Sequence, residues 1–277
     1  MKPFDVHSWV IQQKELIGME LSSLSSSGAC GEVWIQRALE YTLLPAGKLL
    51  RGLLVTAVAE DIAMSQGGSS SENTISFSAA IECLHSASLI HDDLPALDND
   101  DYRRGGPACH KKFGEGVAVL IGDLLVGLAC ESVAQSNFHS DFKVRLHNIL
   151  AESWKKLCVG QILDVSDSTE RDVEKIIEYK TGALFEAACA GAAVCAGVNN
   201  DQVNEWKKWG LELGVLFQKV DDYLDGDAGD TDSQQIMSKL LIIKDSFPMG
   251  IDKSNSAVIY LIETLIERSL NGVVANE

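Results

Sequence analysis

The chain has 277 residues, of which 46% are hydrophobic and 23% are charged, and its formal net charge is −17 at pH 7. These proportions allow a substantial hydrophobic core and exclude an intrinsically disordered chain. The large negative charge argues against a surface for nucleic acid or for an anionic membrane. The seven cysteines contain no Cys-x-x-Cys pair, which indicates reduced thiols in a cytoplasmic protein.

Apolar residues at helical spacing predict four helices in the N-terminal third. The expected ranges are Val6–Leu24, Val33–Leu44, Lys48–Ser65 and Ile75–Ile90, with a serine and glycine loop at 22–31 between the first two. Candidate core residues of the first helix are Trp9, Ile11, Leu16 and Met19. The N-terminal segment carries charges and glutamines, so it lacks the unbroken apolar run of a secretory signal.

The rest of the chain continues the helical pattern after a glycine-rich connection at 105–116. Helices are expected at 117–135, 142–163, 173–198, 202–224 and 257–270, with an acidic loop at 226–233. The helix at 202–224 has one apolar stripe, made of Trp206, Trp209, Leu213, Leu216 and Val220. Asp123 and Glu186 interrupt the apolar runs, so we expect no membrane span. Without period-two stretches or internal repeats, residues 1–277 are predicted to form a single all-α domain.

Acidic residues cluster at the end of the helix expected at Ile75–Ile90. Asp92, Asp93 and Asp98 fall within seven positions. Carboxylates this close repel one another unless a cation lies between them, and hard oxygen ligands suit Mg²⁺. Arg103 and Arg104 come next and could bind phosphate oxygens. A solvated acidic loop is the alternative for this stretch taken alone.

A second acidic cluster follows the tryptophan stripe. Gln218, Asp221, Asp222 and Asp225 are three or four positions apart, so they share one helix face. Stacked like charges destabilise a bare helix by a few tenths of a kcal/mol per pair. A solvated acidic turn is again the alternative, but two helices that each end in clustered aspartates favour a pair of metal-binding motifs.

Together these motifs resemble those of the trans-prenyltransferases, the polyprenyl diphosphate synthases that include farnesyl and geranylgeranyl diphosphate synthases. The motifs are Asp92-Asp93-x-x-x-x-Asp98 followed by Arg103-Arg104-Gly105, and Asp221-Asp222-x-x-Asp225. The order and spacing of further motifs also match, namely Gly47-Lys48-x-x-Arg51, His85, His110–Glu115 and Lys180-Thr181. Each motif alone is weak evidence, whereas the ordered set is specific and covers most of the chain.

The resemblance implies a single-domain bundle of mostly antiparallel helices around a deep central cavity, assembled as a homodimer. The two aspartate motifs would face each other across the cavity mouth and hold three Mg²⁺ ions that bind an allylic diphosphate. The metal ligands would be Asp92, Asp93, Asp98, Asp221, Asp222 and Asp225. Arg103 and Lys180 would share the charge of that diphosphate.

The second substrate implied by the resemblance is isopentenyl diphosphate. Because it lacks the metal cluster, it would depend on cationic and polar side chains, namely Lys48, Arg51, His85, Arg104 and Lys244. The allylic group would leave as a carbocation, which the double bond of isopentenyl diphosphate attacks before a proton is lost. The oxygens of Thr181 and Gln218 would stabilise the cation, and released diphosphate would take the proton.

Product length in this family depends on the residues just before the first aspartate motif, which lie deeper in the cavity. Here they are Ala87 and Ser88, both small, where an aromatic residue would limit the product to farnesyl length. The expected product is therefore geranylgeranyl diphosphate, with farnesyl diphosphate as the alternative.

The chain also departs from the family pattern. Ser238 and Lys239 stand where Lys-Asp is usual, Gly52 follows Arg51 where proline is common, and Gly106 replaces a larger residue. A non-catalytic regulatory subunit of a heteromeric synthase is one alternative function, although such subunits tend to lose their aspartates. A terpene cyclase is another, although that class generally lacks the Lys48, Arg51 and His85 set.

Overall fold

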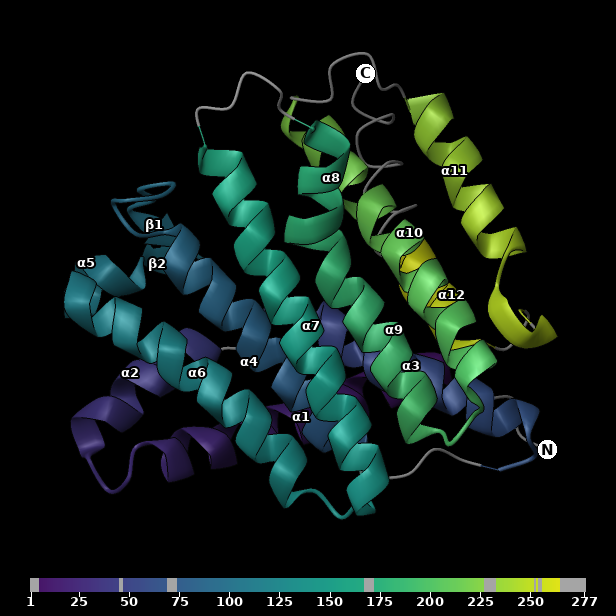
Figure 1. Cartoon of the computed structure of the whole chain (residues 1–277), viewed down its shortest axis with the longest axis horizontal. Coiled ribbons are helices and arrows are strands. Elements are labelled where there is room, and N and C mark those ends of the chain that lie inside the picture. The colour runs from purple at the N-terminus through teal and green to yellow at the C-terminus, as the bar shows by residue number, and fades with distance from the viewer. Residues whose placement is uncertain are drawn as a thin grey trace. The chain divides into compact units, whose positions relative to one another are not determined.

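The computed structural model describes residues 5–44, 47–68, 74–166, 172–226, 233–251, 253 and 256–264, almost all of them in helices (Figure 1). The elements are α1 Val6–Gly28, α2 Val33–Leu43, α3 Leu50–Ser65, α4 Thr74–Asp92, β1 Tyr102–Arg103, β2 Gly106–Pro107, α5 Cys109–Phe113, α6 Glu115–Gln135, α7 Ser140–Val165, α8 Val173–Ile177, η1 Glu178–Gly182, α9 Ala183–Cys195, α10 Asn200–Asp225, α11 Ser233–Asp245, η2 Pro248–Gly250 and α12 Ala257–Ile262. The expected all-α class is confirmed.

The chain forms two compact units, and it passes between them after residues 6, 53, 71 and 150, the second of these within α3 and the last within α7. The first unit is built from residues 7–53 and 72–150, and the second from residues 1–6, 54–71 and 151–277. The expectation of one domain around a deep central cavity stays a prediction.

The core of the first unit lies between α4 and α6. Phe77, Ile81 and Leu84 of α4 are at most 1% exposed. The hydroxyl of Ser132 on α6 donates to the carbonyl of Ser76 at 2.8 Å, which adds a polar tie between the two helices. By length and composition alone α6 could cross a membrane; in this structure it packs against α4, and its Asp123 side chain is 63% exposed.

The core of the second unit lies between α9 and α10. Every residue of α9 is buried, and the five members of the tryptophan stripe on α10 are at most 3% exposed, as the sequence predicts. Glycines permit this close packing, because a Cβ at Gly210 would lie 2.6 Å from the carbonyl oxygen of Phe185. The indole N–H of Trp209 donates to the carbonyl of Ile243 at 2.9 Å and so links α10 to α11.

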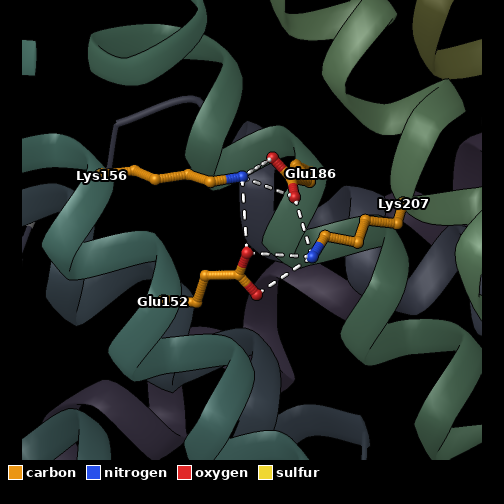
Figure 2. A network of polar contacts seen from close by, with 4 residues as sticks. All are labelled: Glu152, Lys156, Glu186 and Lys207. Atoms are coloured by element: carbon orange, nitrogen blue, oxygen red, sulfur yellow. Dashed lines mark hydrogen bonds and ion pairs between the residues drawn. The ribbon is translucent and has the colours of Figure 1, made fainter.

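Four charged side chains join α7, α9 and α10 in the second unit (Figure 2). The ammonium of Lys156 lies 2.7 Å from the carboxylate of Glu186, and that of Lys207 lies 3.3 Å from it. Lys207 also donates to Glu152 at 3.0 Å. Glu186 is only 7% exposed, so its charge is compensated by the two lysines rather than by water.

Helix α1 is longer than the sequence indicates. The serines expected in a loop continue the helix, because the hydroxyl of Ser25 donates to the carbonyl of Leu21 at 2.9 Å instead of breaking the turn. The buried stripe of α1 consists of Ile17, Leu21, Leu24 and Ser25. The expectation that Ile11 and Met19 are core residues is wrong, since they are 48% and 62% exposed on other faces of the helix.

Further differences concern the connections. The glycine-rich stretch forms a hairpin in which Tyr102 pairs with Pro107 and Arg103 pairs with Gly106, followed by α5. Helix α11 is not among the helices expected from the sequence. The acidic loop lies mostly outside the described residues, as does the part of the last expected helix beyond residue 264.

Candidate active site

The first aspartate motif begins on the last turn of α4, in the first unit. Asp92 ends the helix and is half-buried, and the backbone N–H of Asp98 donates to the carbonyl of Asp92 at 2.9 Å. Asn99 follows with φ 56°, in the left-handed region that asparagine tolerates. This turn leaves Asp98 exposed and ties its backbone to the end of the helix.

Asp93 faces inward, unlike its neighbours in the motif. It is 2% exposed, and the guanidinium of Arg103 donates to its carboxylate through Nε at 2.9 Å and through Nη2. Arg103 also donates to Asp100 at 2.9 Å. Burial raises the pKa of Asp93, and the hydrogen bond and charge of Arg103 oppose that effect. Asp93 therefore holds Arg103 in this structure.

Four of the five expected isopentenyl diphosphate residues belong to the same unit, whereas Lys244 belongs to the second unit. The guanidinium of Arg51 lies 3.2 Å from Nε2 of His85. Arg104 donates to the carbonyl of Thr42 at 3.4 Å, and a Cβ at Gly47 would lie 3.3 Å from its Nε. Lys48 is exposed at the start of α3.

His85 is neutral in this environment. Burial and the charges of Arg51, Arg104 and Arg103 hold its pKa well below the ordinary value. Because a guanidinium only donates, Nε2 of His85 must accept from Arg51, which leaves the ring proton on Nδ1. His85 can therefore offer a hydrogen bond to an anion through Nδ1 without carrying charge.

A pocket of about 120 Å³ opens beside these residues. Its mostly apolar walls come from α2, α4, the hairpin and α5, and its lining residues are Tyr41, Thr42, Ser86, Leu89, Ile90, Asp93, Arg103, Arg104, Gly106, Pro107 and Cys109. The hydroxyl of Tyr41 donates to the carbonyl of Pro107 at 2.7 Å and fixes the hairpin against α2. Ala87 and Ser88 do not line this pocket: Ala87 is fully buried, and the hydroxyl of Ser88 donates to the carbonyl of His85 at 2.9 Å.

The second aspartate motif occupies the C-terminal end of α10, in the second unit. The hydroxyl of Thr181 donates to Oε1 of Gln218 at 2.6 Å, and Nε2 of Gln218 donates to Asp222 at 2.7 Å. Asp221 is half-buried, and Asp225 is exposed at the end of the helix. Thr181, Gln218 and Asp222, three of the predicted site residues, thus form one hydrogen-bonded chain.

Lys180 and Thr181 lie in η1, a π-helical turn between α8 and α9. Such turns are rare and occur frequently at functional sites. Gly160 of α7 accommodates the turn, because a Cβ there would lie 2.8 Å from the backbone nitrogen of Lys180. The ammonium of Lys180 lies 2.5 Å from the carboxylate of Asp164, also on α7.

Asp164 and Gln161 of α7 are further candidate site residues that the sequence motifs did not identify. Both amide atoms of Gln161 are buried without a hydrogen-bond partner among the described residues, which marks it as a group able to bind a substrate or water. The pattern Gln161-x-x-Asp164 repeats the spacing of Gln218-x-x-Asp221. That repetition is the signal by which they could have been found.

Lys244 lies at the end of α11, where its ammonium is 2.7 Å from the carboxylate of Glu263. In this structure it is thus engaged by a carboxylate, and its role with a diphosphate stays a prediction. Ser238, at the departure from the family pattern, donates to the carbonyl of Gln234 at 2.8 Å within α11.

The donor set suits Mg²⁺ in chemical type, since the motif residues offer hard carboxylate oxygens. Among the described residues, no group of three or more His, Cys, Asp or Glu side chains is arranged to hold a metal ion. Asp92 belongs to the first unit and Asp221 to the second. The expected pairing of the two motifs across a cavity stays a prediction.

Comparisons with known proteins identify the family of this chain. The family model described as "Polyprenyl synthetase" matches residues 32–241. The chain is 36% identical over 268 residues to the heterodimeric geranylgeranyl pyrophosphate synthase large subunit 1 of Arabidopsis thaliana, covering 91% of this chain and 70% of that protein. It is 36% identical over 197 residues to the farnesyl diphosphate synthase of Micrococcus luteus, covering 69% of this chain and 66% of that protein.

A solved structure shows the same fold. The geranyltransferase of Legionella pneumophila superposes with a TM-score of 0.85 at 30% identity, covering 96% of this chain and 98% of that one. The ordered motifs and the matches over most of the chain lead to one conclusion: this chain belongs to the polyprenyl synthetase family.

Proposed function

We propose that the protein is a short-chain prenyltransferase that condenses isopentenyl diphosphate with an allylic diphosphate. The observation that carries this proposal is the hydrogen-bonded chain Thr181–Gln218–Asp222 beside the Lys180–Asp164 pair. It joins cation-stabilising oxygens to an aspartate motif within one compact unit. The names of the relatives, geranylgeranyl and farnesyl diphosphate synthases, support the same reaction class.

Ionisation of the allylic diphosphate is the first task of the site. Mg²⁺ held by the two aspartate motifs would supply electrostatic stabilisation of the departing diphosphate. Asp92 and Asp98 offer their oxygens in the first motif, whereas Asp93 acts by holding Arg103. In the second motif, the carboxylate oxygens come from Asp221, Asp222 and Asp225. Lys180 adds a positive charge at the same diphosphate.

Binding of isopentenyl diphosphate falls to a separate set of donors, namely Lys48, Arg51, His85, Arg104 and Lys244. Arg51 donates to His85, which orients both side chains and sets the ring proton of His85 on Nδ1. Because burial and the nearby arginines keep the pKa of His85 low, the side chain would orient the substrate through a hydrogen bond without adding charge. Arg51, Arg104 and Lys48 would neutralise the negative charge of the diphosphate group of the substrate.

The carbocation must be shielded from water until the new carbon–carbon bond forms. The oxygens of Thr181 and Gln218, which share a hydrogen bond, would stabilise the cation electrostatically without forming a bond to it. The released diphosphate takes the proton lost from the condensed product.

The product is geranylgeranyl diphosphate on this proposal, since Ala87 and Ser88 carry no aromatic ring. Farnesyl diphosphate is the alternative, and the Micrococcus luteus relative is named for that product. The Arabidopsis relative is named as the large subunit of a heterodimeric synthase, so a regulatory or heteromeric role is a further alternative. Retention of all six aspartates favours catalysis over a purely regulatory subunit.

We further propose a homodimer located in the cytoplasm. Exposed apolar side chains on α6, Val119 at 39% and Leu120 at 67%, support a subunit contact along that helix. The Arabidopsis relatives are named as chloroplastic, so location is a property on which family members differ.

Incubation of the purified chain with Mg²⁺, isopentenyl diphosphate and each allylic primer, followed by product sizing, tests the proposal. Wild-type protein should elongate at least one primer, and Asp92→Ala and Asp221→Ala should each lower turnover by at least about a hundredfold. The same preparation should sediment at twice the chain mass of 30.0 kDa. Elongation of no primer would favour the regulatory-subunit alternative.

A further inference from the structure

The N-cap residue of α3 is a leucine, whose side chain has no hydrogen-bond acceptor. The backbone N–H of Leu53 donates to the carbonyl of Leu49 at 2.8 Å, which makes Leu49 the N-cap residue. A leucine side chain cannot accept the hydrogen bonds that the first-turn N–H groups require. The φ of Leu49 is 51°, a left-handed conformation that is costly for a residue with a Cβ. The first turn of α3 therefore depends on an acceptor from elsewhere.

Glu82 of α4 supplies this acceptor. Its Oε1 accepts from the backbone N–H of Gly52 at 2.7 Å, and the residue is 4% exposed. Burial raises the pKa of Glu82, while the N–H of Gly52 and the charges of Arg51 and Arg104 lower it. A carboxylate at this place also meets the positive end of the helix dipole. It thus caps α3 from a neighbouring helix.

Gly52 is the residue that makes this contact possible. A Cβ at position 52 would lie 3.0 Å from Cγ of Glu82 and would press on the carboxylate. Proline, common at this position in the family that the sequence resembles, would remove the N–H altogether. Glycine keeps both the donor and the space.

The same helix turn carries the groups assigned to isopentenyl diphosphate. Arg51 lies between Leu49 and Gly52 in the chain and contacts His85, which follows Glu82 by one turn on α4. We propose that Glu82 is a positioning residue: by capping α3 through Gly52, it holds Lys48 and Arg51 in the geometry that binds isopentenyl diphosphate. This inference rests on the proposed function, and Glu82 itself does not contact the substrate.

Two variants test the contact from opposite sides. Gly52→Ala keeps every charge but displaces the carboxylate, and Glu82→Met removes the acceptor at similar volume. Each should raise the KM for isopentenyl diphosphate about tenfold and leave the KM for the allylic primer within about twofold. Because both variants break one contact, their effects should be less than additive in the double variant.

The direction of the change in Glu82→Met separates positioning from simple charge. If Glu82 only diluted the positive charge near Arg51 and Arg104, its removal would strengthen binding of an anionic substrate and lower that KM. A positioning role requires the opposite sign. Both KM values are measured by steady-state kinetics, with circular dichroism confirming that each variant is folded.

Glu40→Gln is the control. Glu40 accepts from Gln36 within α2 at 2.8 Å, outside this cluster, so both KM values should stay at the wild-type level. A KM for isopentenyl diphosphate within twofold of wild type in Gly52→Ala, or an equal rise for both substrates, would overturn the inference. If Glu82→Met does not fold, Gly52→Ala alone decides. A wild-type protein without turnover would instead contradict the proposed function.

Discussion

The adjacent residues Arg103 and Arg104 contact different partners at this site. Arg103 lies in β1 and is engaged by Asp93 and Asp100. Arg104 comes next with φ 52°, a left-handed conformation that turns its side chain toward Thr42 and Gly47. Two neighbouring positive charges are thereby separated between the two proposed diphosphate sites. A lysine at either position would lose the planar set of donors that these contacts use.

The small side chain of Ala87 leads to a prediction about product length. Ala87 is fully buried on α4, five residues before Asp92. Ala87→Phe should shift the main product to a shorter chain, because the ring would fill space that the growing chain needs. Chromatography of the dephosphorylated products measures the change. The added volume should also cost about 1–3 kcal/mol of stability.

Ala118→Phe gives a control for overpacking alone, since Ala118 is equally buried but lies on α6. It should lower stability without changing product length. An unchanged product in folded Ala87→Phe would remove Ala87 from the chain-length assignment.

Residues of the site differ in how far the sequence alone identifies them. The aspartates stand out because acidic runs at the end of an apolar helix are rare without a cation. Gln161 and Asp164 repeat the spacing of a recognised motif, so a search for that spacing would have found them. The role of Glu82 could not be predicted, because nothing in the neighbouring sequence indicates which group a single glutamate inside an apolar helix contacts. Its role depends on Gly52, thirty positions away in the chain.

At the scale of elements, the π-helical turn η1 places Lys180 and Thr181. Helical periodicity predicts a continuous helix over 173–198, whereas the structure has this turn within the helix and ends α9 at Cys195. The nearby Gly160 becomes informative only when the packing of α7 on η1 is known.

The charged network of Figure 2 links three elements that carry site residues or adjoin them. Helix α7 carries Asp164, α9 comes directly after η1, and α10 carries Gln218. Glu186 receives both Lys156 and Lys207 while nearly buried. The network therefore fixes the mutual spacing of these helices within the second unit.

Removal of Glu186 should be costly because it leaves partly buried lysines without a carboxylate. Glu186→Ala should lower the free energy of unfolding by about 3 kcal/mol, in the range for breaking a buried pair. Lys156→Ala combined with Glu186→Ala should cost less than the sum of the single changes. Urea unfolding of the four proteins in this cycle gives the coupling free energy.

Lys208 and Glu212 form the matched control, because they are also an ion pair on α10 but are 80% and 43% exposed and 3.9 Å apart. The same cycle there should give a coupling below about 0.5 kcal/mol. Equal coupling free energies for the two pairs would show that burial does not strengthen the interaction between Lys156 and Glu186.

At the scale of the whole molecule, segments distant in the chain are joined by a buried acid in the second unit. Asp61 of α3 accepts from the backbone N–H of Ala257 at 2.8 Å and of Val258 at 3.2 Å, and from the hydroxyl of Ser256 at 2.5 Å. The first turn of α12 is thus capped by a residue of α3. Like the Glu82 cap, this contact is invisible to local sequence patterns, whereas the family and the helical class are apparent from motifs alone.

This buried acid makes the stability of the folded chain depend on pH. Burial raises the pKa of Asp61 from 3.8 to about 6, even though its three hydrogen bonds favour the charged form. The folded state therefore binds a proton more tightly than the unfolded state. The stability that Asp61 contributes is fully present below pH 3.8 and is lost as the pH rises through about 6.

Asp61→Asn isolates this effect, because asparagine stays neutral across the range. The free energy of unfolding of wild type minus that of Asp61→Asn should fall by about 2 kcal/mol between about pH 4.5 and 7.5. Urea unfolding at several pH values measures it, and the subtraction cancels the effect of the net charge of −17. Asp201→Asn, at an exposed position in the first turn of α10, should show no such trend. A wild-type advantage that grows with pH would mean that the three hydrogen bonds outweigh burial and that Asp61 is a charged cap.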